Sequence, residues 1–199
     1  MLGIILPALR VSLVTWVLCG IAYPLAVTGL GQWLLPAQAN GSLVRAADGT
    51  ILGSRLIGQD WTGPQWFHGR PSATASAPYN AAASGGSNLG PTNRTLAGRL
   101  AADRQAIEAA DPEFAGRRLP ADMLTASASG LDPDISPADA ALQVPRVAAA
   151  RGIAAQRIAT LVARHTAGRD LGIFGERRVN VLELNLDLQN GDFPGRPGR

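Results

Sequence analysis

The chain has 199 residues and a formal net charge of +3, from 18 basic and 15 acidic side chains. With 46% hydrophobic residues, it is long enough for one ordinary domain and a short appendage. The basic residues are scattered arginines without interleaved aromatic side chains, which argues against nucleic acid as a partner, and the single cysteine, Cys19, excludes an internal disulfide.

A membrane anchor is the first element that the sequence predicts. Residues 11–44 contain no charged side chain, and this run exceeds the roughly 20 residues that a helix needs to cross a bilayer. It is also longer than the apolar region of a secretory signal peptide and contains Trp16 and Pro24. We therefore predict an N-terminal flank over residues 1–10 and an uncleaved anchor helix over residues 11–35, in contact with membrane lipid.

The two ends of this anchor differ in charge. Arg10 lies at the amino end, whereas the other end has no basic residue until Arg45, which Asp48 soon follows. Cytoplasmic flanks carry the excess of basic residues, so the pattern favours a cytoplasmic N-terminus and an outside position for everything after about Leu35.

Short elements are expected after the anchor. The letters "PAQANGS", residues 36–42, are typical of a linker, and Asp48-Gly49 supplies the turn of a β-hairpin between two β-rich runs. Residues 61–93 contain one Asp, Glu, Lys or Arg side chain, Arg70, and are rich in Pro, Gly, Ser and Asn. We expect a long ordered loop of the kind that carries function, in which Arg70 bridges carbonyls, pairs with a carboxylate or meets a partner protein.

The stretch "YNAAASGGSNLGPTN", residues 79–93, is the main candidate site within this loop. Its centre is a nucleotide-binding or partner-binding loop that consists of Ser84, Gly85, Gly86, Ser87 and Asn88. Backbone amides of such a loop could hold a phosphate, and the loop could equally wrap a cation or another protein's backbone. It lacks the lysine of a P-loop. Since glycine permits close backbone approach, we expect Gly86→Val to disrupt assembly with a partner more than isolated folding.

Three helical segments are predicted in the second half of the chain. The first lies within residues 95–112 and ends at Pro112. The second has a capping-box-like start, with Ser136 as N-cap, Pro137 at the first helical position and Asp139 three residues after the cap, and Pro145 should kink or divide it. The third places an apolar stripe within residues 152–166, made of Ile153, Ile158, Leu161, Val162 and His165.

The last regular element is predicted to be a strand. In "RVNVLELNLDL", residues 178–188, leucines at every second position alternate with other residues, which is typical of a half-buried strand. Residues 190–199 are expected to be a disordered tail. The predicted fold class is α+β, with a single N-terminal transmembrane helix followed by one extracytoplasmic α+β domain over residues 36–189.

The residue pattern contains no clear catalytic or metal constellation. His68 and His165 lie far apart without acidic or cysteine residues at ligand spacing, which argues against zinc; we interpret His165 as a helix cap and His68 as structural. Asp132 and Asp134 are interpreted as turn and helix-start residues rather than calcium ligands. The G-x-S-x-G motif of a serine hydrolase is missing, although triads occur in several chain orders.

Several motifs follow one another at sensible spacing along the chain. They are "WFHGRPSA", "YN" at Tyr79 and Asn80, "SGGSNLGPTN", "TASASGLDPDIS", "QVPRVAAARG" and "LGIFGERRVNVLELNL". Together they resemble the C subunit of the Kdp-type potassium-transporting ATPase, from the anchor to about Leu188. The chain departs from the family pattern at Ala128, where glycine is usual, at Arg177, where proline is usual, and in the tail beyond Gln189.

This resemblance implies a non-catalytic accessory subunit in the bacterial inner membrane. Its partners would be a potassium-translocating subunit, which handles the potassium, and a P-type ATPase subunit, which hydrolyses the ATP. The family is commonly assigned the role of a catalytic chaperone that raises the ATP affinity of the pump subunit through a shared nucleotide. Residues 84–88 resemble the signature loop of ABC-type ATPases, so the resemblance directs ATP to this loop.

The shared-nucleotide role conflicts with the orientation that the charges favour. With the N-terminus inside, residues 84–88 face a side with little ATP, and no nucleotide is shared with a cytoplasmic ATPase domain. In that orientation the domain packs over the outer mouth of the translocating subunit, and its effect on ATP affinity is allosteric. The alternative hypothesis is a stand-alone membrane-anchored extracytoplasmic enzyme, serine hydrolase-like, or a binding protein.

Overall fold

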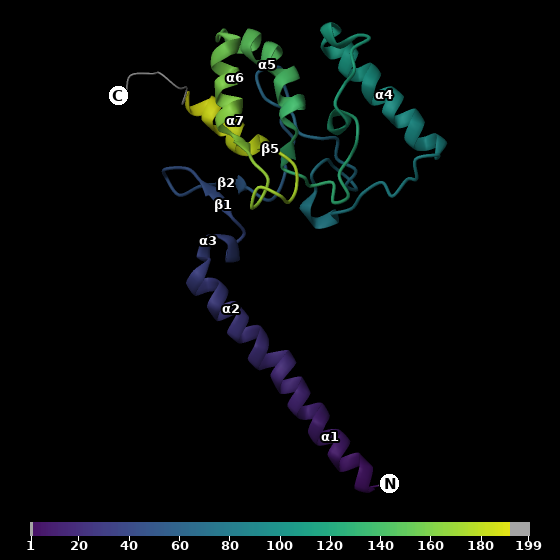
Figure 1. The fold of residues 1–199 in the computed structure, drawn as a ribbon, viewed down its shortest axis with the longest axis vertical. Helices are drawn as coiled ribbons and strands as arrows, with labels where there is room; N and C mark the ends of the chain where they lie inside the picture. The colour runs from purple at the N-terminus through teal and green to yellow at the C-terminus, as the bar shows by residue number, and fades with distance from the viewer. Residues whose placement is uncertain (1, 192–199) are drawn as a thin grey trace. The chain divides into compact units, whose positions relative to one another are not determined.

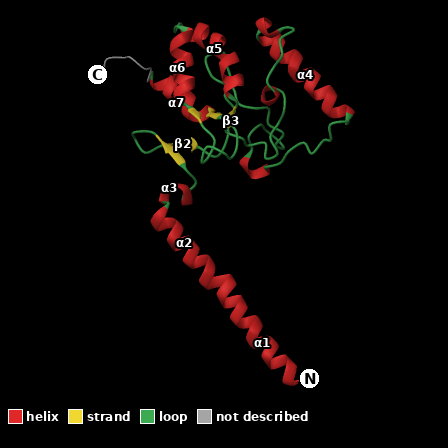
Figure 2. Cartoon of the chain, in the orientation of Figure 1, coloured by secondary structure: helices red, strands yellow, loops and turns green. Residues whose placement is uncertain are grey.

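The computed structural model describes residues 2–191, and the chain divides into two compact units, Met1–Leu52 and Gly53–Arg199. The predicted α+β class is confirmed, because a long apolar helix is followed by a domain of mixed helices and short strands (Figures 1 and 2). The predicted tail falls mainly outside the described residues, which end at Gly191.

A long apolar helix opens the first unit. It consists of α1 Leu2–Val17, the π-helical turn η1 Leu18–Ala22 and α2 Tyr23–Leu34. Within residues 2–191, Gly3–Leu34 is the one helix long and apolar enough to span a membrane. The helix begins at Leu2, so most of the flank expected over residues 1–10 is also helical. The π-turn ends two residues before Pro24, and the Tyr23 N–H donates to the Leu18 carbonyl.

The expected linker and hairpin follow this helix. Part of the linker forms a short helix, α3 Pro36–Ala39, and the predicted hairpin is confirmed as β1 Leu43–Arg45 paired with β2 Ile51–Ser54. Its turn is closed by the Ala46 N–H, which donates to the Thr50 carbonyl at 2.9 Å. Gly49 has a φ of 87°, a left-handed conformation that glycine adopts without steric cost.

The second unit begins with the predicted long loop. Over residues 61–93 the loop contains one short 3₁₀ turn, η2 Ala81–Ala83, which confirms the expectation of a structured loop without longer elements. The helix expected before Pro112 is α4 Arg94–Ala110, and Asn93 caps it by accepting from the Thr95 N–H at 2.8 Å. Two 3₁₀ turns follow, η3 Pro112–Phe114 and η4 Ala121–Met123.

The core of the second unit lies among its C-terminal helices and strands. These elements are β3 Asp134–Ile135, α5 Pro137–Arg151, α6 Ala155–Arg164, β4 Thr166–Ala167, β5 Arg178–Asn180 and α7 Val181–Asn190. The strands form an antiparallel sheet in the order β3-β5-β4, with Val179 of β5 opposite Ile135 and Thr166. Phe67 of the long loop belongs to the same buried cluster as residues of α5, α6 and α7, so the core holds this loop in place.

The strand predicted over residues 178–188 is wrong for most of its length. Only Arg178–Asn180 is a strand, and the leucine-rich remainder is α7. Asn180 caps this helix by accepting from the Glu183 N–H at 3.1 Å. Val181, Leu184 and Leu188 are buried at a helical spacing, and the polar Asn185 is buried with them. Leucine at every second position does not require a strand, because leucine itself favours helices, and Leu186 is only half-buried.

Of the two effects expected of Pro145, a kink or a division of the helix, division is wrong. The helix runs from Pro137 to Arg151 and ends at Gly152, whose φ of 64° is typical of a C-terminal cap. A proline removes the hydrogen bond to the carbonyl four residues earlier, here that of Ala141. Ala141 is exposed, so water can hydrogen-bond the freed carbonyl and the helix continues.

Candidate functional site

The predicted site loop, residues 84–88, lies against residues 128–130 of the same domain. The Gly85 N–H donates to the Ser129 carbonyl at 2.9 Å, and Ser84 Oγ donates to the same oxygen at 3.1 Å. A β-carbon on Gly86 would stand 2.8 Å from the Ala128 carbonyl oxygen, whereas one on Gly85 would meet no atom within 4 Å. The loop therefore has a packed side at Gly86 and an open side at Gly85.

The close backbone approach at Gly86 is thus made within this chain. Gly86→Val should therefore also cost folding stability, because the added carbon would press on a backbone carbonyl that cannot rotate away as a side chain does. Whether assembly suffers more than isolated folding stays a prediction. One of the amides considered for a phosphate, that of Gly85, is already bonded to Ser129. Ser87 is half-buried, and Asn88 is exposed with a φ of 50°.

Residues of the long loop, and Gly58 just before it, continue this pairing along residues 130–132. Ser72 Oγ donates to the Gly130 carbonyl at 2.7 Å, and the Gly58 N–H donates to the Leu131 carbonyl at 2.8 Å. Arg70 pairs with Asp132 at 2.8 Å and also donates to the Thr125 carbonyl at 3.3 Å. Of the alternatives for Arg70, the carboxylate partner is therefore realised, and among the described residues its carbonyl contact is with Thr125 rather than with several carbonyls.

The two aspartates considered as cation ligands have protein partners. Asp132 pairs with Arg70, and Asp134 accepts from Asn180 Nδ2 at 3.2 Å and lies 3.5 Å from Arg178 Nε. Burial raises the pKa of Asp134. Among residues 2–191, no cluster of three or more His, Cys, Asp or Glu side chains could hold a metal ion.

Two side-chain amides hold adjacent residues of the long loop. Asn185 of α7 accepts from the Phe67 N–H and donates to the Phe67 carbonyl, both at 2.9 Å. Gln143 of α5 does the same for His68, accepting from its N–H at 2.8 Å and donating to its carbonyl at 3.0 Å. Each amide thus replaces a neighbouring strand, which supplies one acceptor and one donor in the same way.

Arg146 of α5 joins the loop to the end of α4. One of its terminal nitrogens donates to the carbonyls of Pro64 and Trp66 at 2.8 and 3.0 Å, and the other donates to Gln143 Oε1 at 2.7 Å. Its Nε lies 3.1 Å from Asp111 Oδ2. The planar guanidinium suits four acceptors at fixed directions, so Arg146 organises this part of the domain.

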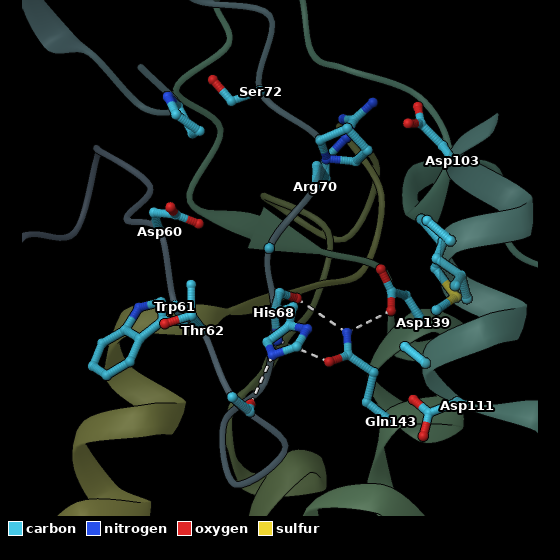
Figure 3. A pocket seen from close by; sticks show the side chains of 18 of the residues that line it. Asp60, Trp61, Thr62, His68, Arg70, Ser72, Asp103, Asp111, Asp139 and Gln143 are labelled. Atoms are coloured by element: carbon cyan, nitrogen blue, oxygen red, sulfur yellow. Dashed lines mark hydrogen bonds between the residues drawn. The ribbon is translucent and has the colours of Figure 1, made fainter. Parts of the chain in front are cut away.

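A pocket of about 810 Å³ lies between the long loop, the second half of α4 and the first half of α5 (Figure 3). Its walls are mainly apolar and aromatic and include Trp61, Tyr79, Ile107, Phe114 and Met123. Polar groups at the pocket include His68, Asp139 and Gln143. None of residues 84–88 lines it, so the pocket and the predicted loop are separate features of the domain.

Asp139 is the most unusual polar group of this pocket. The predicted cap is confirmed in part, since Ser136 Oγ accepts from the Asp139 N–H at 3.0 Å. In a capping box the side chain three residues after the cap accepts from the N–H of the cap residue. Here Asp122 takes that place, because the Ser136 N–H donates to Asp122 Oδ2 at 2.6 Å. The Asp139 carboxyl is therefore free to accept from Gln143 Nε2 at 2.7 Å, and burial raises its pKa to about 7.

Burial also shifts the pKa values of two other groups at the pocket. It lowers the pKa of His68, whose Nε2 lies 2.9 Å from the Gly63 carbonyl oxygen and donates to it. It raises the pKa of Tyr79 to about 12, and the Tyr79 hydroxyl donates to the Arg70 carbonyl at 2.6 Å. Near neutral pH His68 is uncharged and Tyr79 keeps its proton, which fits the structural role expected for His68.

His165 lies at the C-terminal end of α6, as expected. Its Nε2 is 2.8 Å from Asp187 Oδ2 of α7, so the side chain connects two helices. It does not line the pocket. This arrangement is consistent with a stabilising role at a helix terminus.

Gln143 and Asn185 are not among the site residues predicted from the sequence. Within the strand predicted over residues 178–188, Asn185 is one of the residues that alternate with the leucines, and no motif of the sequence includes Gln143 as a site residue. A signal was present, because residues 181, 185 and 188 share one face when a helix is assumed. An amide among apolar residues on such a face indicates that it satisfies buried backbone groups.

Comparisons with known proteins agree over nearly the whole chain. A family model described as "KdpC: K+-transporting ATPase, c chain" matches residues 5–190. The chain is 55% identical over 184 residues to the "Potassium-transporting ATPase KdpC subunit" of Gemmatimonas aurantiaca, covering 92% of this chain and 91% of that protein. It is 58% identical over 171 residues to the protein of the same name from Nitratidesulfovibrio vulgaris, covering 86% and 85%.

Proposed function

Because the chain belongs to the family of KdpC, the c chain of K+-transporting ATPases, we propose that it is a non-catalytic accessory subunit of an ATP-driven potassium uptake complex. The observation that carries this proposal is the match over residues 5–190, which includes both the anchor helix and the α+β domain. Its partners are a potassium-translocating subunit and a P-type ATPase subunit of the same bacterial inner-membrane complex.

We propose that the N-terminus is cytoplasmic and the α+β domain periplasmic. Arg10 is the basic residue at the amino end of the apolar helix, and the next basic residue is Arg45. In this orientation the domain lies on the side from which potassium enters. It packs over the outer mouth of the potassium-translocating subunit, and the anchor helix braces the complex within the membrane.

An exposed apolar loop between β4 and β5 is the surface best suited to such packing. Leu171, Ile173 and Phe174 are 88%, 72% and 63% exposed. The loop is ordered, because Asp170 and Phe174 exchange backbone hydrogen bonds in both directions at 2.9 Å. Grouped exposed apolar side chains on a rigid loop are typical of a protein interaction site.

Phe174→Asp is expected to weaken assembly while leaving the domain folded. Hot-spot side chains contribute about 2 kcal/mol or more, so the amount of translocating subunit that co-purifies with the chain should fall by at least about tenfold. The melting temperature should stay close to that of the wild-type chain, because Phe174 is exposed. Leu56→Asp is the matched control, since Leu56 is 60% exposed in the same unit but outside the β4–β5 loop. If the two variants lost the same amount of co-purifying translocating subunit, the β4–β5 loop would not be the interaction surface.

We propose that residues 84–88 form a second partner contact through their open side at Gly85. The family's chaperone role, raising the ATP affinity of the pump subunit, is then exerted allosterically. Such an effect requires the domain to bind one state of the pump more tightly than another. The alternative, direct contact of these residues with ATP, requires a domain that faces the cytoplasm.

A cysteine at position 84 distinguishes these two mechanisms. In a Cys19→Ala background, Ser84→Cys should react in intact cells with a membrane-impermeant maleimide, because Ser84 is exposed and the domain is periplasmic. Gly3→Cys in the same background should react only after the membrane is permeabilised. If Ser84→Cys reacted only after permeabilisation and Gly3→Cys reacted from outside, the domain would face the cytoplasm. That result would favour direct contact of residues 84–88 with ATP.

A further inference from the structure

The pocket beside α5 has the size and lining of a small-molecule site. Its volume of about 810 Å³ lies within the range of roughly 300–1,000 Å³ that is typical of ligand pockets. Trp61, Tyr79 and Phe114 contribute aromatic rings, and Ile107 and Met123 contribute aliphatic surface. Nothing in the proposed subunit role accounts for such a pocket.

One oxygen of the Asp139 carboxylate is among the buried polar atoms of the lining residues that make no hydrogen bond to the described residues; the others are Asp103 Oδ2 and Trp61 Nε1. The Asp139 side chain is part of a residue only 1% exposed, and its Oδ1 accepts from Gln143 Nε2. Its Oδ2 is buried and makes no hydrogen bond to the described residues. In Figure 3 this carboxyl lies at the pocket, with its second oxygen directed away from Gln143. A buried acceptor without a partner is costly, so a ligand that donates to Oδ2 is favoured.

Most of the other charges around the pocket are already paired. Arg70 pairs with Asp132, and Arg146 pairs with Asp111. Asp103 of α4 pairs with Arg99 at 3.8 Å. His68 is neutral near pH 7 because burial lowers its pKa. When Asp139 is ionised, the pocket therefore carries unbalanced negative charge, to which the exposed Asp60 at its edge adds.

We propose that this pocket binds an organic ammonium ion, with an apolar body between the aromatic walls and an ammonium group that donates to Asp139 Oδ2. Two features select a cation over other ligands. The ammonium supplies both the missing donor and the missing positive charge, and the faces of aromatic rings attract cations. A carboxylate ligand would meet an unpaired negative charge, and an alcohol would supply the donor without the charge.

Calorimetric titration of the full-length chain in mild detergent tests the proposal. The probe is cyclohexylmethylammonium at pH 8, with cyclohexylmethanol and cyclohexanecarboxylate as isosteric comparators and empty micelles as blank. The ammonium should bind at least tenfold more tightly than either comparator. Absence of binding, or equal binding of the alcohol, would overturn the proposal.

Two substitutions separate the site from the fold. Asp139→Asn keeps the oxygen that accepts from Gln143 and removes the charge, so ammonium affinity should fall at least tenfold. Ile107→Trp fills the pocket from α4 and should lower affinity to the same extent without touching α5. Asp134→Asn is the control, because Asp134 is a half-buried carboxylate outside the pocket, and it should bind like the wild-type chain. Unchanged affinity in both pocket variants would refute the site.

The pH dependence gives a test that needs no substitution. Asp139 faces Arg70, Arg146 and Asp122, and its pKa of about 7 in the empty pocket means that a cation binds best above this pH. From the ionised fraction, affinity should be about tenfold weaker at pH 6 than at pH 8. Asp139→Asn should remove this difference. An equal pH dependence in Asp139→Asn would assign it to another group, such as His68, and contradict the role of Asp139.

Discussion

Asn185→Ala is expected to lower the free energy of unfolding of the α+β domain by about 2–6 kcal/mol. The substitution leaves both the N–H and the carbonyl of Phe67 without a partner, and each unsatisfied buried group costs about 1–3 kcal/mol. Phe67 and Asn185 are both 0% exposed, so water cannot replace the amide. Since small domains have total stabilities of about 5–15 kcal/mol, this loss is a large fraction of the whole.

Urea unfolding of the full-length chain in mild detergent measures this effect. Asn190→Ala is the matched control, because it makes the same change at an exposed position of the same helix and should stay within about 0.5 kcal/mol of wild type. Hydrogen exchange at the Phe67 amide should also accelerate in Asn185→Ala. If Asn185→Ala were as stable as Asn190→Ala, the amide would not be what fixes the long loop to α7.

Arg146→Ala is expected to be nearly as damaging, at about 3–5 kcal/mol. It leaves Asp111 as an unpaired, mostly buried carboxylate, which is the costly way to break an ion pair. It also removes the donors to Pro64, Trp66 and Gln143. The amide of Gln143 then loses one of the contacts that orient it toward His68, so the pocket wall loosens as well.

Arg146→Lys tests whether charge or geometry matters more. Lysine keeps the positive charge near Asp111 but cannot present the planar fork, so we expect it to recover only part of the lost stability. Arg118→Ala removes an exposed arginine of the same domain and serves as the control. Full recovery in Arg146→Lys would show that charge alone holds Asp111, and would contradict the proposed role of the guanidinium fork.

Sequence patterns that are compatible with only one local structure predicted that structure correctly. Asp48-Gly49 predicted a turn because Gly49 needs the left-handed conformation that it adopts. Ser136-Pro137 predicted the start of α5 because a serine cap and a proline at the first helical position both fit helix initiation. The anchor helix followed from length and apolarity alone.

Sequence patterns whose structural outcome depends on tertiary packing gave poorer predictions. Leucines at every second position fit a strand, and only the burial of Val181, Asn185 and Leu188 on one face shows that tertiary contacts select a helix. The effect of Pro145 depended on whether the freed carbonyl reaches water, which a sequence does not state. The sequence likewise does not determine which backbone Gly86 approaches. A close approach to Ala128 and a close approach to another subunit would both require glycine at this position.

Sequence patterns alone could not predict the pocket. Asp139 looked like half of a capping box, and its free carboxyl depends on Asp122 taking over the bond to Ser136. The two residues lie on different elements, and no local spacing connects them. The family resemblance implies a site at residues 84–88, whereas the structure places the polar groups of the pocket around α5.

Co-purification tests the central claim, membership of a potassium-transporting complex, most directly. The tagged chain, expressed at its native level and extracted in mild detergent, should bring down a potassium-translocating subunit and a P-type ATPase subunit in fixed proportion. These partners should be identified by mass spectrometry and remain bound through size-exclusion chromatography. Recovery of the chain alone, while both multi-span subunits are intact and associated with each other in the same extract, would contradict the account and favour a stand-alone anchored protein.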